Sequence, residues 1–167
     1  KSDTIAAIAT ALSDAGIGII RISGPEAIAV ANRVVVNKKK EHTLKNWQTH
    51  TIHYGFVEEN GTILDEVMVS VMKAPRSYTT EDTVEINCHG GVLLTKRVLE
   101  AVLHAGARMA EPGEFTFRAF VKNKAAVALR TGEDVTILAY GVLVNNALKA
   151  AELLEKQGVH AGVVKLN

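Results

Sequence analysis

The segment E-I-N-C-H-G-G, residues 85–91, constrains the fold of this chain more than any other stretch. It predicts a strand over residues 83–88 that passes through two glycines into a helix. Apolar residues recur at helical spacing after Gly91, and the helix is expected to end at Gly106. Glycine has no Cβ, so such a junction lets a ligand or another backbone segment come close to main-chain N–H groups. The segment therefore predicts a helix packed on a sheet and marks a candidate binding site.

A β-hairpin is predicted around Asn60-Gly61. Strand patterns over 51–57 and 63–71 flank this dipeptide, and a type I′ turn needs positive φ at both central positions. Val67, Val69 and Val71 alternate along the second strand, so we expect them on one face. Upstream, strands are expected over 4–9 and 16–23, followed by a helix from Pro25 to about Val34.

The last third of the chain has a different pattern. Residues 115 to about 129 predict one or two short helices. Beyond them, a strand over 134–140, a helix within 143–157 and a strand over 159–166 predict a βαβ unit with parallel strands and a right-handed crossover. We expect no further strand in this unit, which is too small to be stable alone.

Composition excludes several function classes. The chain has 167 residues, enough for one domain with a small appendage, and its net charge of +1 produces no general field for nucleic acid or membrane. Cys88 is the single cysteine, so an internal disulfide and a multi-cysteine metal site are both excluded. No apolar run is long enough for a bilayer, and no signal peptide is evident, so we expect a cytoplasmic protein without membrane contact.

Four features of the sequence allow a chemical and a structural interpretation. Cys88 and His89 resemble a nucleophile–base pair, but neighbours on a strand point to opposite faces, which favours a structural Cys88. Glu85 is either an acceptor for an N–H-rich heterocycle or a solvated acid. Arg21 interrupts an apolar strand, so it meets either an internal acid or an anionic ligand. Gly90-Gly91 either lets the start of the helix bind an anion or the polar edge of a ring, or allows the helix to pack tightly on the strand.

Five motifs then appear in one order: D-T-I-A-A at 3–7, G-I-I-R-I-S-G at 18–24, Y-T-T-E-D-T-V-E at 78–85, C-H-G-G at 88–91 and A-R-M-A-E-P-G-E-F-T at 107–116. Through them, residues 3–124 resemble the N-terminal domain of the MnmE/TrmE tRNA-modification GTPases. The resemblance implies an α+β fold, with an aminomethyltransferase-like, folate-binding mixed sheet and helices. It also implies a homodimer that holds a 5-formyltetrahydrofolate-type cofactor near its interface, for a one-carbon step in modifying the wobble uridine of tRNA.

The same resemblance assigns three cofactor-binding residues, namely Arg21, Glu85 and Lys124. Glu85 would accept N–H bonds from the aminopyrimidine edge of a pterin. Arg21 and Lys124 would meet carbonyl or glutamate oxygens. Residues 121–123, just before Lys124, depart from the family's usual pattern.

Parts of the family are absent from this sequence, namely a helical domain, the G domain and a C-terminal Cys-x-Gly-Lys tail. We therefore expect no GTP hydrolysis and no catalysis by this chain alone, with tRNA reached only through those domains or partner proteins. An independent enzyme that uses Cys88 or His89 is a weaker hypothesis.

A second resemblance covers residues 129–166, through L-R-T-G-E-D-V-T-I-L-A-Y-G at 129–141 and A-L-K-A-A-E-L-L-E-K at 147–156. These residues resemble part of the C-terminal domain of the transketolase/deoxyxylulose-phosphate synthase group, without its thiamine-binding parts. The two resemblances predict a folate-binding domain at 1–124 followed by a βαβ segment at 125–167. The alternative is a structural chimera, natural or engineered, that neither binds ligand nor catalyses a reaction.

Overall fold

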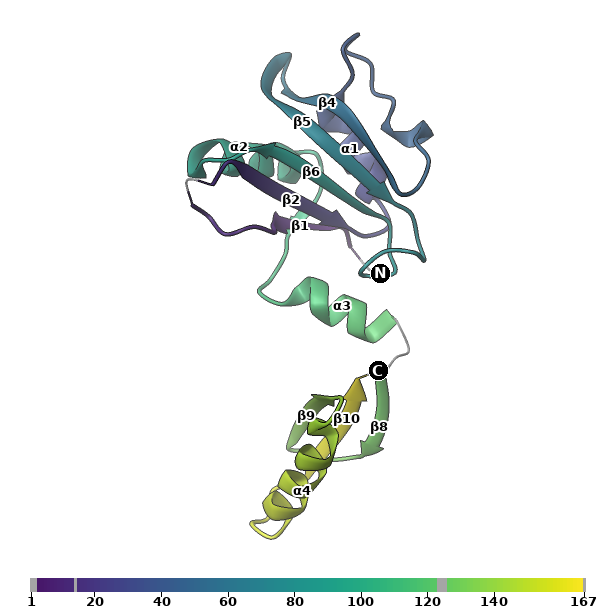
Figure 1. The fold of residues 1–167 in the computed structure, drawn as a ribbon, viewed down its shortest axis with the longest axis vertical. Helices are drawn as coiled ribbons and strands as arrows, with labels where there is room; N and C mark the ends of the chain where they lie inside the picture. The colour runs from purple at the N-terminus through teal and green to yellow at the C-terminus, as the bar shows by residue number, and fades with distance from the viewer. Residues whose placement is uncertain (1–2, 14, 123–125, 167) are drawn as a thin grey trace. The chain divides into compact units, whose positions relative to one another are not determined.

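A computed structural model of the chain describes residues 3–13, 15–122 and 126–166 (Figure 1). The chain forms two compact units that divide after Phe115. The first unit contains a seven-stranded sheet and the second a three-stranded sheet. Mixed sheets with helices confirm the predicted α+β class.

The first unit begins with strands β1 (Ile5–Ile8) and β2 (Ile17–Ser23), and helix α1 (Ala27–Val34) follows. Its remaining elements are β3 (Val35–Val36), the 3₁₀ turn η1 (Leu44–Asn46), β4 (Thr51–Glu59), β5 (Thr62–Met72), β6 (Thr83–His89), α2 (Val92–His104) and β7 (Arg108–Met109). The strand order is β3-β4-β5-β6-β2-β1-β7, and neighbours are antiparallel except for the β1–β7 pair. The strands at the two edges, β3 and β7, are two residues long.

One face of this sheet is covered and the other is open. Helices α1 and α2 lie on the same side of the sheet (Figure 1), where Val30 and Val98 join a core with sheet residues such as Val69 and Ile86. Val67, Val69 and Val71 are all buried, as their alternation predicted. Because side chains alternate along a strand, the residues between these buried ones point to the open face.

The predicted hairpin is confirmed in detail. Asn60 has φ 51° and Gly61 has φ 81°, both in the left-handed region that a type I′ turn requires. β4 and β5 pair on either side of this turn, with a register shift between Val57 and Glu58. The turn fixes the register of β4 against β5, and with it which side chains of these strands share the open face.

The second unit departs from its prediction in one respect. Helix α3 (Glu114–Lys122) crosses the division between units, and β8 (Ala126–Arg130), β9 (Val135–Tyr140), α4 (Leu143–Glu155) and β10 (Ala161–Leu166) follow. β9 and β10 are parallel, as predicted, and α4 packs on one face of the sheet.

The expectation of helix up to residue 129, and of no third strand in this unit, was wrong. β8 pairs antiparallel with β10, which gives the order β8-β10-β9. The added strand pairs the backbone groups along the second edge of β10, which would otherwise lack partners.

Candidate functional site

Arg21 and Glu85, two of the three predicted site residues, meet on the open face of the first sheet. β2 and β6 pair in a register that places these residues directly opposite each other. Arg21 Nε donates to Glu85 Oε1 at 2.7 Å, and the two side chains are 31% and 23% exposed. The open question about Arg21 is thus answered by an internal acid, which remains accessible to solvent on one side.

Two aromatic rings lie close to the Arg21 guanidinium. Its Cζ lies 5.8 Å from the ring centroid of Tyr78 and 5.8 Å from that of Phe115. Contacts of this length between a guanidinium and a ring face are attractive. Arg21 therefore contacts three parts of the first unit, namely Glu85 on β6, the loop after β5 and the first turn of α3.

A buried polar network holds the loop that carries Tyr78. Ser23 Oγ donates to Glu81 Oε2 at 2.9 Å and lies 2.6 Å from Thr79 Oγ1. All three residues are buried, so these hydrogen bonds are shielded from competing water. The end of β2 and the Y-T-T-E-D motif thus form one structure beside the Arg21–Glu85 pair.

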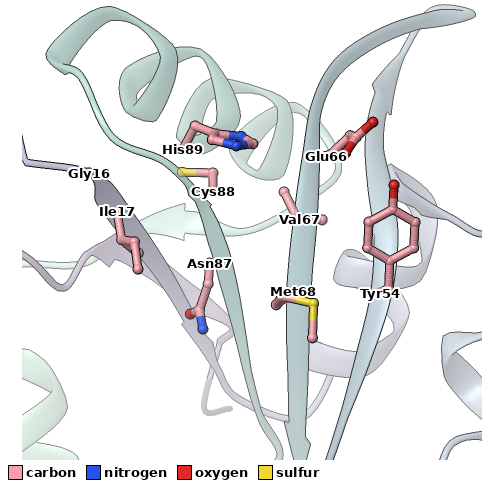
Figure 2. Close-up of a pocket in the computed structure, with 9 residues that line it drawn as sticks. All are labelled: Gly16, Ile17, Tyr54, Glu66, Val67, Met68, Asn87, Cys88 and His89. Atoms are coloured by element: carbon pink, nitrogen blue, oxygen red, sulfur yellow. The ribbon is translucent and has the colours of Figure 1, made fainter.

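A hollow of about 340 Å³ lies farther along the open face (Figure 2). It is lined by Gly16, Ile17, Tyr54, Glu66, Val67, Met68, Asn87, Cys88 and His89. In the sheet register, Tyr54 lies opposite Met68 and Met68 lies opposite Asn87, so a row of side chains crosses β4, β5 and β6. The lining is mostly apolar, with polar groups at the rim.

The hollow and the ion pair are adjacent but separate. Arg21 and Glu85 are not among the lining residues. Asn87, however, follows Glu85 by two positions on β6, which is about 7 Å along a strand and on the same face. The ion pair and the hollow therefore form one continuous surface.

Asn87 carries a buried acceptor whose hydrogen-bonding capacity is unused. Its Oδ1 is enclosed and, within the described part of the chain, has no hydrogen-bond partner. An enclosed amide oxygen without a partner costs about 1–3 kcal/mol. The acceptor that a ligand can reach is the carboxylate of Glu85, which is 23% exposed and suits a group rich in N–H donors.

His89 stands at the rim and is held by Asp65 on β5. The backbone N–H of His89 donates to Asp65 Oδ2 at 2.7 Å, and its Nδ1 lies 2.8 Å from Asp65 Oδ1. The hydrogen bond and negative charge of Asp65 raise the pKa of His89 above its ordinary value. The imidazole therefore carries a proton, and a positive charge, over a wider pH range than a free histidine.

Cys88 takes no part in a dyad with His89, as strand geometry predicted. The thiol lies on the covered face, where Cys88 is 2% exposed and Sγ donates to the carbonyl oxygen of Gly18 at 3.2 Å. Burial raises the pKa of the Cys88 thiol, which disfavours the reactive thiolate. Cys88 is therefore a core residue.

Gly90 is required by close packing, and Gly91 by its backbone conformation. A Cβ at Gly90 would lie 1.4 Å from the carbonyl oxygen of Ala15, and the Gly90 N–H donates to Gly16 at 3.0 Å. The loop before β2 thus lies directly against the junction. Gly91 has φ +104°, a conformation that residues with side chains rarely adopt.

The third predicted residue, Lys124, lies outside the described residues. Within them, no helix is long and apolar enough to cross a membrane. The same residues contain no group of three or more His, Cys, Asp and Glu side chains arranged to hold a metal ion.

Sequence reasoning did not identify Asp65 and Asn87. Asn87 could have been found, because it alternates with Glu85 and His89 in the segment that drew attention first. Asp65 could not, since its contact with His89 depends on how β5 pairs with β6, and no local pattern encodes that pairing.

A seven-stranded mixed sheet with two helices on one face, and an ion pair beside a hollow on the other, defines an α+β domain with a candidate small-molecule site. The family described as GTP-binding protein TrmE N-terminus matches residues 4–124, and the chain belongs to that family. A second family, described as transketolase, C-terminal domain, matches residues 124–167. The chain thus joins segments of two families.

Relatives named tRNA modification GTPase MnmE match the first segment. The protein of Lachnoclostridium phytofermentans is 59% identical over 124 residues, which cover 74% of this chain and 27% of that protein. The protein of Streptococcus thermophilus is 54% identical (73% and 26% covered), and that of Bacillus subtilis is 50% identical (73% and 27%). The chain spans about a quarter of the length of these curated relatives.

Proposed function

We propose that the first unit binds a reduced folate of the 5-formyltetrahydrofolate type and that it dimerises. In the longer relatives this binding would serve modification of the wobble uridine of tRNA, with tRNA reached through other domains or partner proteins. The observation that carries the proposal is the accessible Arg21–Glu85 pair next to a hollow on the open face of the sheet. A cytoplasmic location accords with the single, buried cysteine.

Glu85 is the proposed anchor for the pterin. Arg21 donates to one of its oxygens, which fixes the carboxylate and leaves the second oxygen for ligand N–H groups. Charge-assisted hydrogen bonds of this kind are stronger than neutral ones. Tyr78 and Phe115, each 5.8 Å from the Arg21 guanidinium, supply aromatic rings near the proposed position of the pterin.

The proposed dimer would use the open face of the sheet. Large apolar side chains are exposed there: Ile17 (59%), Ile52 (63%), Tyr54 (42%) and Met68 (44%). A cluster of this kind on one face is typical of a surface that a partner covers. Sedimentation velocity of the wild type and of Ile52→Lys, with and without folate, tests this; we expect a dimer that the lysine disrupts, and a wild-type monomer under all conditions would refute it.

Calorimetric titration of the whole chain with 5-formyltetrahydrofolate tests the binding. We expect Glu85→Gln to weaken binding about 10- to 100-fold, because a charged acceptor bond contributes about 1.5–3 kcal/mol. Glu100→Gln, an exposed acid on α2, is the control and should bind as the wild type does. If the wild type produces no binding heat, or if both variants bind equally well, the proposal is wrong.

The alternative is a structural chimera without ligand binding. It is favoured by one observation, namely that the transketolase-like match begins at residue 124, where the third predicted folate residue lies. A folded, folate-inert wild-type protein in the same titration would support this alternative.

A further inference from the structure

We propose that the loop between β3 and β4, residues 37–50, contacts the phosphate backbone of RNA. This segment, the basic loop, contains Lys38, Lys39, Lys40 and Lys45. The contact goes beyond the proposed function, because it needs no folate and adds a direct contact with RNA to those made by other domains or partner proteins. Only the choice of RNA over DNA rests on that function, since the phosphates of the two are alike.

The charge of the chain is unevenly distributed. The sequence has 19 Lys and Arg and 18 Asp and Glu side chains; the basic loop holds four of the bases and one acid, Glu41, which leaves 15 bases and 17 acids elsewhere. The four lysines are exposed, and none of them forms an ion pair within the described residues. The small net charge of the chain therefore conceals a local positive surface that attracts a polyanion.

The three consecutive lysines belong to a turn that Asn37 fixes. Its Oδ1 accepts hydrogen bonds from the backbone N–H of Lys39 at 2.8 Å and of Glu41 at 3.0 Å. The Glu41 carboxylate in turn accepts the side-chain N–H of Asn37 at 3.0 Å, so the one acid of the loop is engaged inside the turn. Lys38 Nζ lies 5.4 Å from the ring centroid of Tyr54 on β4. The turn is thus ordered before a partner binds, which lowers the entropic cost of binding.

The rest of the basic loop folds back beside its own start. His42 Nδ1 lies 3.1 Å from the carbonyl oxygen of Val35, and the backbone N–H of Lys45 donates to Asn32 Oδ1 at 3.4 Å. Because β3 is an outer strand, the loop lies at an edge of the first sheet. Lys45 therefore adds its charge to the same edge as the lysine turn.

The composition of the loop favours a nucleic acid over a membrane. Among the described residues, positions 37–50 contribute none of the large apolar side chains that are exposed. Segments that bind a lipid surface by insertion need such side chains. Lysine is a compact point charge that suits phosphate, and a nucleic acid presents one phosphate per nucleotide. We therefore expect contacts with the backbone, which do not depend on base sequence.

The test measures fluorescence anisotropy of a fluorescein-labelled RNA stem–loop, titrated with the whole chain at a series of NaCl concentrations. Each phosphate that a lysine neutralises contributes about 0.7–0.9 to the slope of log affinity against log salt, so four lysines predict a slope of about −3. The combined variant Lys38→Gln, Lys39→Gln and Lys40→Gln should bind at least about tenfold more weakly at low salt, with a slope of about −1.

Two further variants separate position from charge. Lys96→Gln, Lys149→Gln and Lys156→Gln together remove the same charge at exposed sites outside the basic loop, and this control should bind RNA as the wild type does. Asn37→Ala keeps all four lysines but releases the turn, so it should weaken binding about threefold with an unchanged salt slope. Circular dichroism of each variant verifies that a loss reflects binding and not unfolding.

The outcomes decide the proposal. If the variant of the lysine turn binds RNA as the wild type does, or if the control loses as much affinity, the contact is refuted. Tighter binding to a DNA stem–loop of the same sequence, or to phosphatidylserine vesicles, would refute RNA as the partner. The folate titration keeps the two proposals apart: a wild type that binds folate but no RNA refutes only the basic-loop contact, whereas one that binds RNA but no folate supports that contact and refutes the proposed function.

Discussion

Replacement of Gly90 by alanine tests whether the glycine pair serves packing or ligand binding. The new Cβ would lie 1.4 Å from the oxygen and 2.5 Å from the carbon of the Ala15 carbonyl, both main-chain atoms. Ordinary contacts need more than 3 Å, so the loop before β2 would have to move. Overpacking costs about 1–3 kcal/mol, and loss of the Gly90–Gly16 hydrogen bond adds about 1 kcal/mol. We expect about 3 kcal/mol of lost stability.

The neighbouring glycine provides a matched control. At Gly91 a Cβ would meet nothing within 4 Å, so Gly91→Ala brings only the backbone strain of φ +104°. That strain costs about 1–3 kcal/mol. Gly90→Ala should therefore be at least as destabilising as Gly91→Ala.

Urea unfolding measures both variants. The single tryptophan, Trp47, stacks on His53 at 3.9 Å within the first unit, so its fluorescence reports unfolding of that unit. The midpoint should fall in proportion to the lost free energy, with an unchanged slope. A Gly90→Ala protein as stable as the wild type would refute the packing argument. If that stable variant also lost folate affinity, the junction would instead be a ligand site.

Three further outcomes are expected. Ile86→Ala, at a fully buried core position, should cost about 2–5 kcal/mol in urea unfolding, whereas Leu93→Ala, 76% exposed on α2, should cost less than about 0.5 kcal/mol. Cys88 should react slowly with iodoacetamide at pH 8 until the protein is unfolded, because burial raises the pKa of its thiol; fast alkylation of the folded protein would contradict this. In an NMR titration, His89 should titrate above the usual value and Asp65→Asn should lower its midpoint. Since the pKa is raised in the folded state, this pair stabilises the fold at pH below the unfolded value and ceases to do so as pH rises through the folded one.

Local patterns predicted most of the first unit. Alternation at Val67, Val69 and Val71 identified the covered face, and Asn60-Gly61 identified the hairpin, because both signals depend on neighbours in sequence. β8 was missed because Ala126–Arg130 is short and becomes a strand only by pairing with β10, about 35 residues later. The two-residue strands β3 and β7 depend on their partners in the same way.

The site was predictable in part for the same reason. The family motifs identified Arg21 and Glu85, but only the register of β2 against β6 shows that they form an ion pair. Tyr78 and Phe115 stood within quoted motifs, yet their contacts with Arg21 depend on loops whose course no periodicity encodes. Strand alternation correctly separated Cys88 from His89, because that separation is a property of any strand.

The short outer strands of the first sheet affect how this chain associates at high concentration. β3 and β7 present only two residues each, so they form poor templates for the addition of a foreign strand. In the second unit, β8 and β9 are the outer strands, with five and six residues, and Leu138 on β9 is 53% exposed. Fibrous or amorphous aggregation should therefore begin in the second unit, and a lysine at position 138 should delay it without changing the first.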